Sequence, residues 1–169
     1  MPESGELSDR IVVLGRGGVG DASAAAQLAE ICARPLIHID KHFWPVDRRP
    51  QPAPHWADVQ AHIAGNRQWV LDADLGPFDI DEPRLGNPDE VWVLDFSPLT
   101  CLIRALRYPT ERRDLRVWLF RWRREYLRAA MAHIAADPRV RLRRFRTVAQ
   151  LQTALDEAAN CCADEVAAA

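Results

Sequence analysis

Lysine is almost missing from this chain of 169 residues. Lys41 is the only one, so arginine carries nearly all of the positive charge. The planar guanidinium group suits two-point contacts with phosphate, although coding composition explains the same bias and is the interpretation we put first. The net charge at pH 7 is only -2, which gives no reason to expect nucleic acid or an anionic membrane as the main partner.

Long apolar runs and paired cysteines are missing as well. No segment has the apolar length of a membrane span, and the acidic residues near the start are untypical of a signal peptide. The four cysteines, Cys32, Cys101, Cys161 and Cys162, lack the paired spacing of a metal site. Cys32 and Cys101 fall on apolar helical faces, where we expect small buried thiols in a reducing compartment. These absences predict a soluble cytoplasmic protein with no membrane partner.

The length suits one compact domain that needs no disulfide or metal for stability. Residues 1–9 are polar and lack periodicity, so we expect a disordered N-terminus. Residues 10–158 carry the strand and helix patterns of a single domain. The alanine-rich residues 159–169 are expected to form a frayed tail.

A glycine-rich loop follows the first apolar run, Ile11 to Leu14, and leads into a helical pattern. Its outline matches the phosphate-binding loop G-x-x-x-x-G-K-[S/T], with the two outer glycines in place. The lysine position holds Asp21, and the position of the magnesium-binding hydroxyl holds Ala22. We therefore predict a degenerate Walker A loop that has lost its main cation and its metal ligand. The predicted phosphate loop comprises Gly15, Arg16, Gly17, Gly18, Gly20, Asp21, Ala22 and Ser23.

Short apolar runs alternate with helical patterns along the rest of the chain. The expected strands cover residues 11–14, 35–40, 69–72, 91–95 and 139–143, the last with its charged side chains facing outward as on an edge strand. This alternation predicts a parallel sheet with helices on both faces. Ligands of such sheets bind at the carboxyl ends of the strands, where we expect Gly15, Asp40, Asp72 and Asp95 to lie together. Residues 73–90 are expected to form a surface loop.

The helical patterns carry recognisable start signals. Ser97 and Pro98 are typical of a helix N-terminus, and Thr147 to Gln150 form a capping box. The expected apolar faces hold Leu102, Ile103 and Leu106 in the first of these helices, and Val148, Leu151 and Leu155 in the second. Other helices are expected at residues 22–32, at residues 56–63, and in an arginine-rich segment from Leu115 to Ile134 that ends before Asp137-Pro138.

These motifs, taken in order, resemble those of the small P-loop kinases related to adenylate kinase. The pattern is most similar to the bacterial DNA topology modulation or FlaR-like proteins. The resemblance rests on the glycine-rich loop, His38-Ile39-Asp40, Phe43-Trp44, Trp69-Val70-Leu71-Asp72, Leu94-Asp95 and the arginine-rich helix. It implies a three-layer P-loop NTPase fold of the nucleoside-monophosphate-kinase type, with a five-stranded parallel sheet in the order 2-3-1-4-5.

The resemblance also implies roles for individual residues. Asp40, Phe43, Trp44 and Asp72 would bind the phosphate acceptor, with Asp40 as general base, and Asp95 would hold a metal ion through water. Arg104, Arg107, Arg123 and Arg124 would stand near the transferred phosphoryl group. The chain departs from the family pattern at Asp21, at Ala22 and after Asp72, and its lid is reduced to residues near 108–114.

Three functions are consistent with these departures. The first is a pseudokinase-like homologue with weak or no ATP-dependent phosphotransfer and no required cofactor, retained for binding a small ligand or a protein partner. The second is an active nucleotide or small-molecule kinase or ATPase that uses ATP and magnesium, with arginines replacing the lost lysine. Arg16 is the main candidate, because the loop also resembles the deviant loop of MinD- and ParA-like ATPases. The third is a structural module whose arginine-rich helix docks a partner.

Each predicted site residue also has a purely structural interpretation. Asp21 at a helix N-terminus would be stabilised by unpaired backbone N–H groups. An acid at a strand end, such as Asp40, Asp72 or Asp95, often caps the next helix. An arginine-rich helix commonly has a solvated face with no binding role. Here the family resemblance is the reason to consider a functional role.

Overall fold

The computed structural model describes residues 7–15, 21–38, 65–72, 88–107 and 127–168. Its elements are β1 (Arg10–Gly15), α1 (Asp21–Ile31), β2 (Leu36–His38), β3 (Trp69–Asp72), β4 (Glu90–Leu94), α4 (Pro98–Arg107), α6 (Leu127–Ala136), β5 (Arg141–Phe145) and α7 (Val148–Ala168). The predicted helix at residues 56–63, the lid near residues 108–114 and the first part of the arginine-rich helix lie outside the described residues. None of the described helices is both long and apolar enough to cross a membrane.

The described strands form one parallel sheet in the order β2-β3-β1-β4-β5. This order confirms the prediction. β1 lies at the centre because its residues Ile11 to Leu14 are apolar on both faces and are all buried. β2 and β5 form the two edges of the sheet. The side chains of β2 are only partly buried, whereas β5 has an exposed Arg144 and a buried Phe145.

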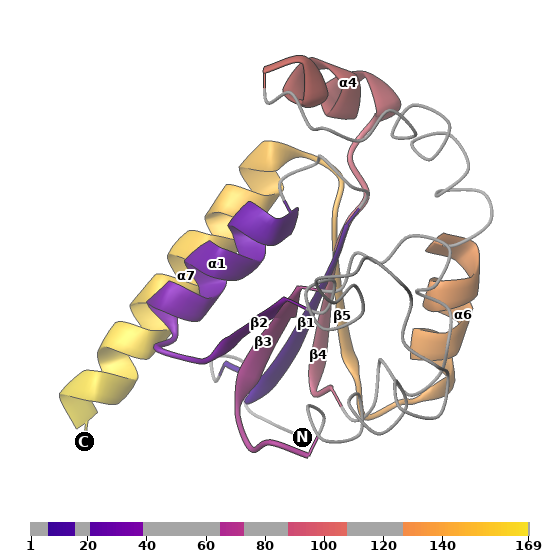
Figure 1. The fold of residues 1–169 in the computed structure, drawn as a ribbon. Helices are drawn as coiled ribbons and strands as arrows, with labels where there is room; N and C mark the ends of the chain where they lie inside the picture. Colours follow the sequence, from indigo (N-terminus) through magenta and orange to yellow (C-terminus); the bar gives the residue numbers. More distant parts are fainter. Residues whose placement is uncertain (1–6, 16–20, 39–64, 73–87, 108–126, 169) are drawn as a thin grey trace, which may run out of the picture.

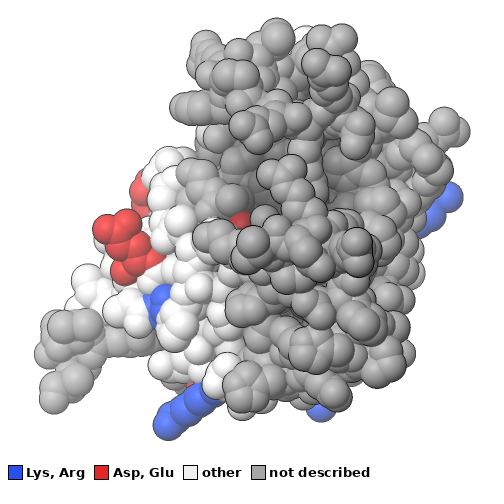
Figure 2. All heavy atoms as spheres, viewed as in Figure 1, with Lys and Arg blue, Asp and Glu red and all other residues white. Residues whose placement is uncertain are grey.

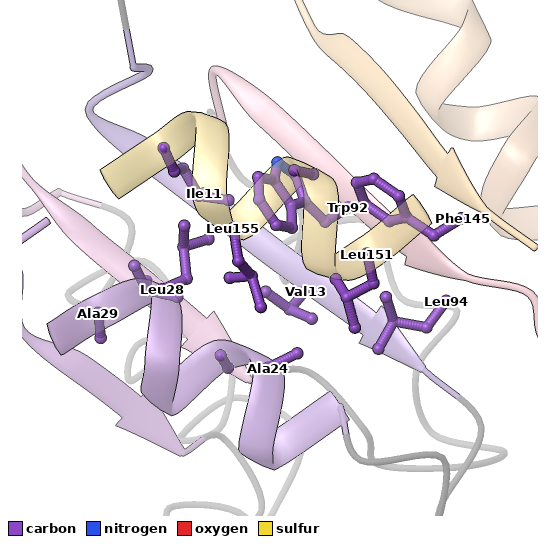
Figure 3. Close-up of a cluster of buried hydrophobic side chains, with 14 of the residues drawn as sticks. Ile11, Val13, Ala24, Leu28, Ala29, Trp92, Leu94, Phe145, Leu151 and Leu155 are labelled. Atoms are coloured by element: carbon purple, nitrogen blue, oxygen red, sulfur yellow. The ribbon is translucent and has the colours of Figure 1, made fainter. Parts of the chain in front are cut away.

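Helices cover both faces of the sheet, as the alternation of strands and helices predicted (Figure 1). α1 and α7 lie side by side on one face, and their side chains Leu28 and Leu155 pack with Val13 of β1 in the main core cluster (Figure 3). α6 covers the other face, where Ile134 packs in a second cluster with Val12. Neighbouring residues of β1 therefore belong to different layers of the core, as expected for a strand buried on both faces.

The predicted helix starts are confirmed at α4 and α7. The Ser97 hydroxyl accepts a hydrogen bond from the Thr100 backbone N–H at 3.1 Å, and Pro98 is the first residue of α4. At α7, the Gln150 backbone N–H donates to the Thr147 hydroxyl at 3.2 Å, and the Gln150 side-chain oxygen accepts from the Thr147 backbone N–H. Both caps satisfy backbone groups that lie outside the regular helical hydrogen bonds.

Two helices differ from the sequence prediction. α7 continues to Ala168, so the residues after 158 are helical where a frayed tail was expected. Alanine favours helix, and Cys161 and Cys162 extend the buried stripe by packing against the main cluster. On α4, Ile103 was assigned to an apolar face but is 46% exposed, and Val148 at the start of α7 is 41% exposed. Helical periodicity identifies an apolar stripe but does not show whether another element covers it.

Glu90 corrects another prediction. It was placed in a surface loop, yet it is the first residue of β4 and is only 1% exposed. Its carboxylate accepts hydrogen bonds from Trp92 Nε1 at 2.7 Å and from Ser8 Oγ at 2.9 Å, and Arg141 Nη1 lies 3.5 Å from it. A buried carboxylate is stable only with such partners. Glu90 reaches these partners because it lies in β4, inside the sheet, and not in a surface loop.

The neighbouring residues at this amino-terminal edge of the sheet form a second ion pair. Arg10 donates to both carboxylate oxygens of Asp89, at 3.1 and 2.9 Å, and its backbone N–H also donates to Asp89. The side-chain hydrogen bond with Asp89 raises the pKa of Arg10 above its ordinary value. This two-point contact ties the start of β1 to the start of β4.

The edge strand β5 does not direct all of its arginines outward as predicted. The strand runs from Arg141 to Phe145, two residues later than the predicted range, and Arg143 lies on the side of α7. Its guanidinium group stands 5.2 Å from the ring centre of Trp92 and pairs with Glu157 of α7 at 2.8 Å. The long apolar part of an arginine side chain explains how such a residue can cover a core aromatic.

We predict that Glu90→Ala lowers the free energy of unfolding by about 1 to 3 kcal/mol, because Trp92 Nε1 and Ser8 Oγ lose their acceptor. Glu30→Ala is the matched control: Glu30 is exposed on α1, and its replacement should change stability by less than about 0.5 kcal/mol. Urea denaturation of both variants and the parent chain measures the difference. Equal stability of the two variants would contradict the structural role of Glu90.

Candidate functional site

The carboxyl ends of the strands meet at one edge of the sheet. β1 ends at Gly15, which pairs with Leu94, and β3 ends at Asp72, which pairs with Val13 of β1 and His38 of β2. Asp95 directly follows β4. As predicted, Gly15, Asp72 and Asp95 therefore lie at the same edge. Asp40, predicted to join them, lies outside the described residues.

The helix that follows the glycine-rich loop begins at Asp21. Asp21, Ala22 and Ser23 thus form the first turn of α1, whose backbone N–H groups have no partners within the helix. Such a helix end attracts anions in general, and a carboxylate near it is stabilised in the same way. Arg16, Gly17, Gly18 and Gly20 lie outside the described residues, so their assignment to a phosphate loop stays a prediction.

A hydrogen-bonded pair of side chains connects the end of β2 to the end of β3. His38 Nδ1 lies 3.0 Å from Asp72 Oδ2. The Asp72 side chain is only 9% exposed, while that of His38 is 26% exposed. Asp72 was predicted as an acceptor contact, whereas His38 was not expected to be a site residue. The pairing could have been found only from the register of the two strands, in which His38 lies opposite Asp72.

A second pair lies at the other side of the same edge. Arg144 of β5 donates from Nε to Asp95 Oδ2 at 3.1 Å, and its Nη2 contacts the same oxygen. Asp95 is buried at 2% exposure, and its backbone N–H donates to the Phe145 carbonyl oxygen. Sequence reasoning missed Arg144, because a predicted strand ending at residue 143 left it in a loop.

The two pairs belong to opposite faces of the sheet. Val70 and Leu36 pack on the α1 and α7 face, so strand alternation places Asp72 and His38 on that face too. Leu142 packs on the α6 face, which is therefore also the face of Arg144. The first turn of α1 thus shares its face with the His38–Asp72 pair and not with the Asp95–Arg144 pair.

Several predicted site residues cannot be placed within this arrangement. Arg104 and Arg107 belong to the C-terminal half of α4, in Pro98–Arg107. Phe43, Trp44, Arg123 and Arg124 lie outside the described residues. In the view of Figure 2, the described basic side chains are scattered and do not gather into one patch.

The described residues do not provide a ready metal site. Among them, no group of three or more His, Cys, Asp or Glu side chains is arranged to hold a metal ion. Asp95, predicted as a metal ligand, already has a guanidinium cation on Oδ2. A divalent cation at this carboxylate would have to displace Arg144 or tolerate its charge at close range. Among the described residues, the Asp95 carboxylate is thus already paired with a cation.

Comparison with known proteins identifies the fold. No family model and no curated protein matches the chain. Among solved structures, it is similar to a gluconokinase from Sinorhizobium meliloti 1021, with 19% identity, 94% of each chain covered and a TM-score of 0.54. It is also similar to the shikimate kinase from Acinetobacter baumannii in complex with shikimate, with 15% identity, coverage of 89% of this chain and 93% of that chain, and a TM-score of 0.58. A shikimate kinase from Bacteroides thetaiotaomicron aligns with 12% identity over 89% of this chain and 96% of that chain, at a TM-score of 0.54. The fold is thus that of the small P-loop kinases.

We predict that Arg144→Leu lowers the free energy of unfolding by about 1 to 3 kcal/mol, because it leaves the buried Asp95 carboxylate without its guanidinium partner. Arg139→Leu is the matched control, since Arg139 forms its ion pair with Asp137 on the exposed surface, and no measurable loss is expected. Denaturant titration of both variants tests this difference. A loss no larger for Arg144→Leu than for Arg139→Leu would show that the buried pair has no stabilising role.

Proposed function

We propose that this protein is a degenerate P-loop kinase homologue that has weak or no ATP-dependent phosphotransfer and is retained for binding a ligand on the acceptor side of the fold. The kinase-like fold supports the ancestry. The particular likeness to DNA topology modulation or FlaR-like proteins rests on the sequence motifs, including the His38-Ile39-Asp40 and Phe43-Trp44 stretches. The same motifs support a bacterial, cytoplasmic protein.

The start of α1 carries this proposal. The helix begins with Asp21 and Ala22, at the positions where a P-loop has its lysine and its magnesium-binding hydroxyl. Phosphoryl transfer depends almost wholly on positioning and on neutralising phosphate charge. Two unit charges about 4 Å apart interact by about 4 kcal/mol at an effective dielectric of 20, so an acid near the phosphates opposes binding by an amount of this order.

The end of β4 supports the same conclusion. A kinase needs a metal ion to bridge the phosphates. Asp95 is the described carboxylate predicted to serve that ion, and it forms an ion pair with Arg144 instead. Both the loop and the end of β4 therefore favour an internally neutralised edge over a magnesium-nucleotide site.

The acceptor side is where we place the retained ligand. The solved structures of similar fold include a gluconokinase, a shikimate kinase in complex with shikimate, and a sugar kinase that is 16% identical with a TM-score of 0.50. Their names point to small molecules rich in hydroxyl groups. We propose a ligand of this class, bound beside the ends of β2 and β3 without phosphate transfer.

Calorimetric titration with ATP and Mg²⁺ tests the loss of nucleotide binding. We expect no saturable binding to the parent chain, because Asp21 stands where the motif has the lysine that attracts the phosphates. The Asp21→Lys, Ala22→Ser double variant restores the lysine and hydroxyl of the motif, and we expect it to gain binding.

A micromolar dissociation constant for the parent chain would contradict the proposal. If that binding came with ATP turnover that disappears in Arg16→Ala, the result would support an active enzyme in which an arginine replaces the lysine. Failure of the double variant to gain binding would show that changes outside the loop also prevent nucleotide binding.

A further inference from the structure

His38 and Asp72 differ in how far each can reach a ligand. The Asp72 side chain is 9% exposed and is held by the His38 ring, whereas the His38 side chain is 26% exposed. Of the two side chains at the carboxyl edge of β2 and β3, the imidazole is therefore the more accessible. The sequence names Asp72 as the contact residue, and that role stays a prediction.

The hydrogen bond between the two residues determines whether the other ring nitrogen, Nε2, donates or accepts a hydrogen bond. An ionised carboxylate only accepts hydrogen bonds, so beside an ionised Asp72 the donor of this 3.0 Å contact is His38 Nδ1–H. In the neutral ring, Nε2 then has no hydrogen and is an acceptor. An acceptor nitrogen of this kind recognises a group that donates, such as a hydroxyl.

The position of the pair agrees with such a role. His38 is the last residue of β2 and Asp72 is the last residue of β3, at the edge where open parallel sheets bind ligands. The pair also shares a face of the sheet with α1, which contacts both β2 and β3. Adjacent strands hold the two side chains in register, so the orientation of the ring is built into the sheet.

We propose that His38 accepts a hydrogen bond from a hydroxyl group of the ligand through Nε2, and that Asp72 is the positioning residue that keeps the ring in this tautomer and orientation. This inference rests on the proposed acceptor-side binding and names the residue that recognises the ligand. It applies to small alcohols and polyols, and it does not require a nucleotide or a metal.

The test uses ethylene glycol as a hydroxyl probe and dimethoxyethane as a control that accepts hydrogen bonds but cannot donate them. Proton–nitrogen correlation NMR of the imidazole rings in the whole chain reports the tautomer of each histidine. We expect His38 to show an unprotonated Nε2, and we expect ethylene glycol, but not dimethoxyethane, to shift this resonance saturably. The remaining histidines are internal controls for general solvent effects.

Two variants separate ligand recognition from a purely structural cross-strand bond. His38→Asn keeps an N–H donor near Asp72 but removes Nε2, so we expect the melting temperature to stay unchanged. Probe binding is followed by saturation-transfer NMR, and in this variant we expect the signal of ethylene glycol to fall to that of dimethoxyethane. Asp72→Asn should move His38 toward the tautomer with hydrogen on Nε2 and weaken probe binding about threefold to tenfold, which corresponds to the loss of one hydrogen bond.

A protonated Nε2 in the parent chain would overturn the inference, as would equal shifts of all histidines with both probes. Unchanged probe binding by His38→Asn would assign the pair a structural role only. Because neither probe carries phosphate, these outcomes are independent of the nucleotide titration. Tight ATP binding would refute the degenerate-kinase proposal without affecting the tautomer of His38.

Discussion

Acids on the inner strands of this sheet depend on bases supplied by the edge strands. His38 on β2 pairs with Asp72 on β3, and Arg144 on β5 pairs with Asp95 after β4. At the opposite end of the sheet, Arg141 on β5 lies beside the buried Glu90 on β4. A carboxylate removed from water is costly unless it is paired or hydrogen-bonded, so slipping an edge strand would break a contact that stabilises a buried acid. We infer that these pairs help to specify the strand register.

The same constraint shapes the candidate site. Polar side chains at the carboxyl edge of a parallel sheet are usually available to a ligand. Here Asp95 is engaged by a guanidinium group, and the helix that would bind phosphate begins with an acid. On the α6 face of the edge, the Asp95 carboxylate is therefore neutralised by Arg144. The α1 face differs, because its pair includes a partly exposed imidazole with a second nitrogen. We place ligand recognition there for this reason.

Much of the fold was predictable from the sequence because its signals are local. The apolar run from Ile11 to Leu14 marks a strand buried on both faces, and Ser97 and Thr147 mark helix starts by short-range hydrogen bonds. The sheet order came from the family resemblance and not from periodicity. The polar pairs were not predictable in this way. Which base faces which acid depends on the register between strands distant in sequence, and an arginine on a short edge strand gives the same pattern whether it meets solvent or Asp95.

The central claim is that the carboxyl edge of the sheet is neutralised by the protein's own side chains and does not form a metal-nucleotide site. Electron paramagnetic resonance of Mn²⁺ with ATP measures this most directly, because the ion reports any ternary complex with the protein. We expect the protein to leave the Mn²⁺-ATP spectrum unchanged and the Asp21→Lys, Ala22→Ser variant to alter it. A protein-bound Mn²⁺-ATP signal from the parent chain that disappears in Asp95→Asn would contradict the claim.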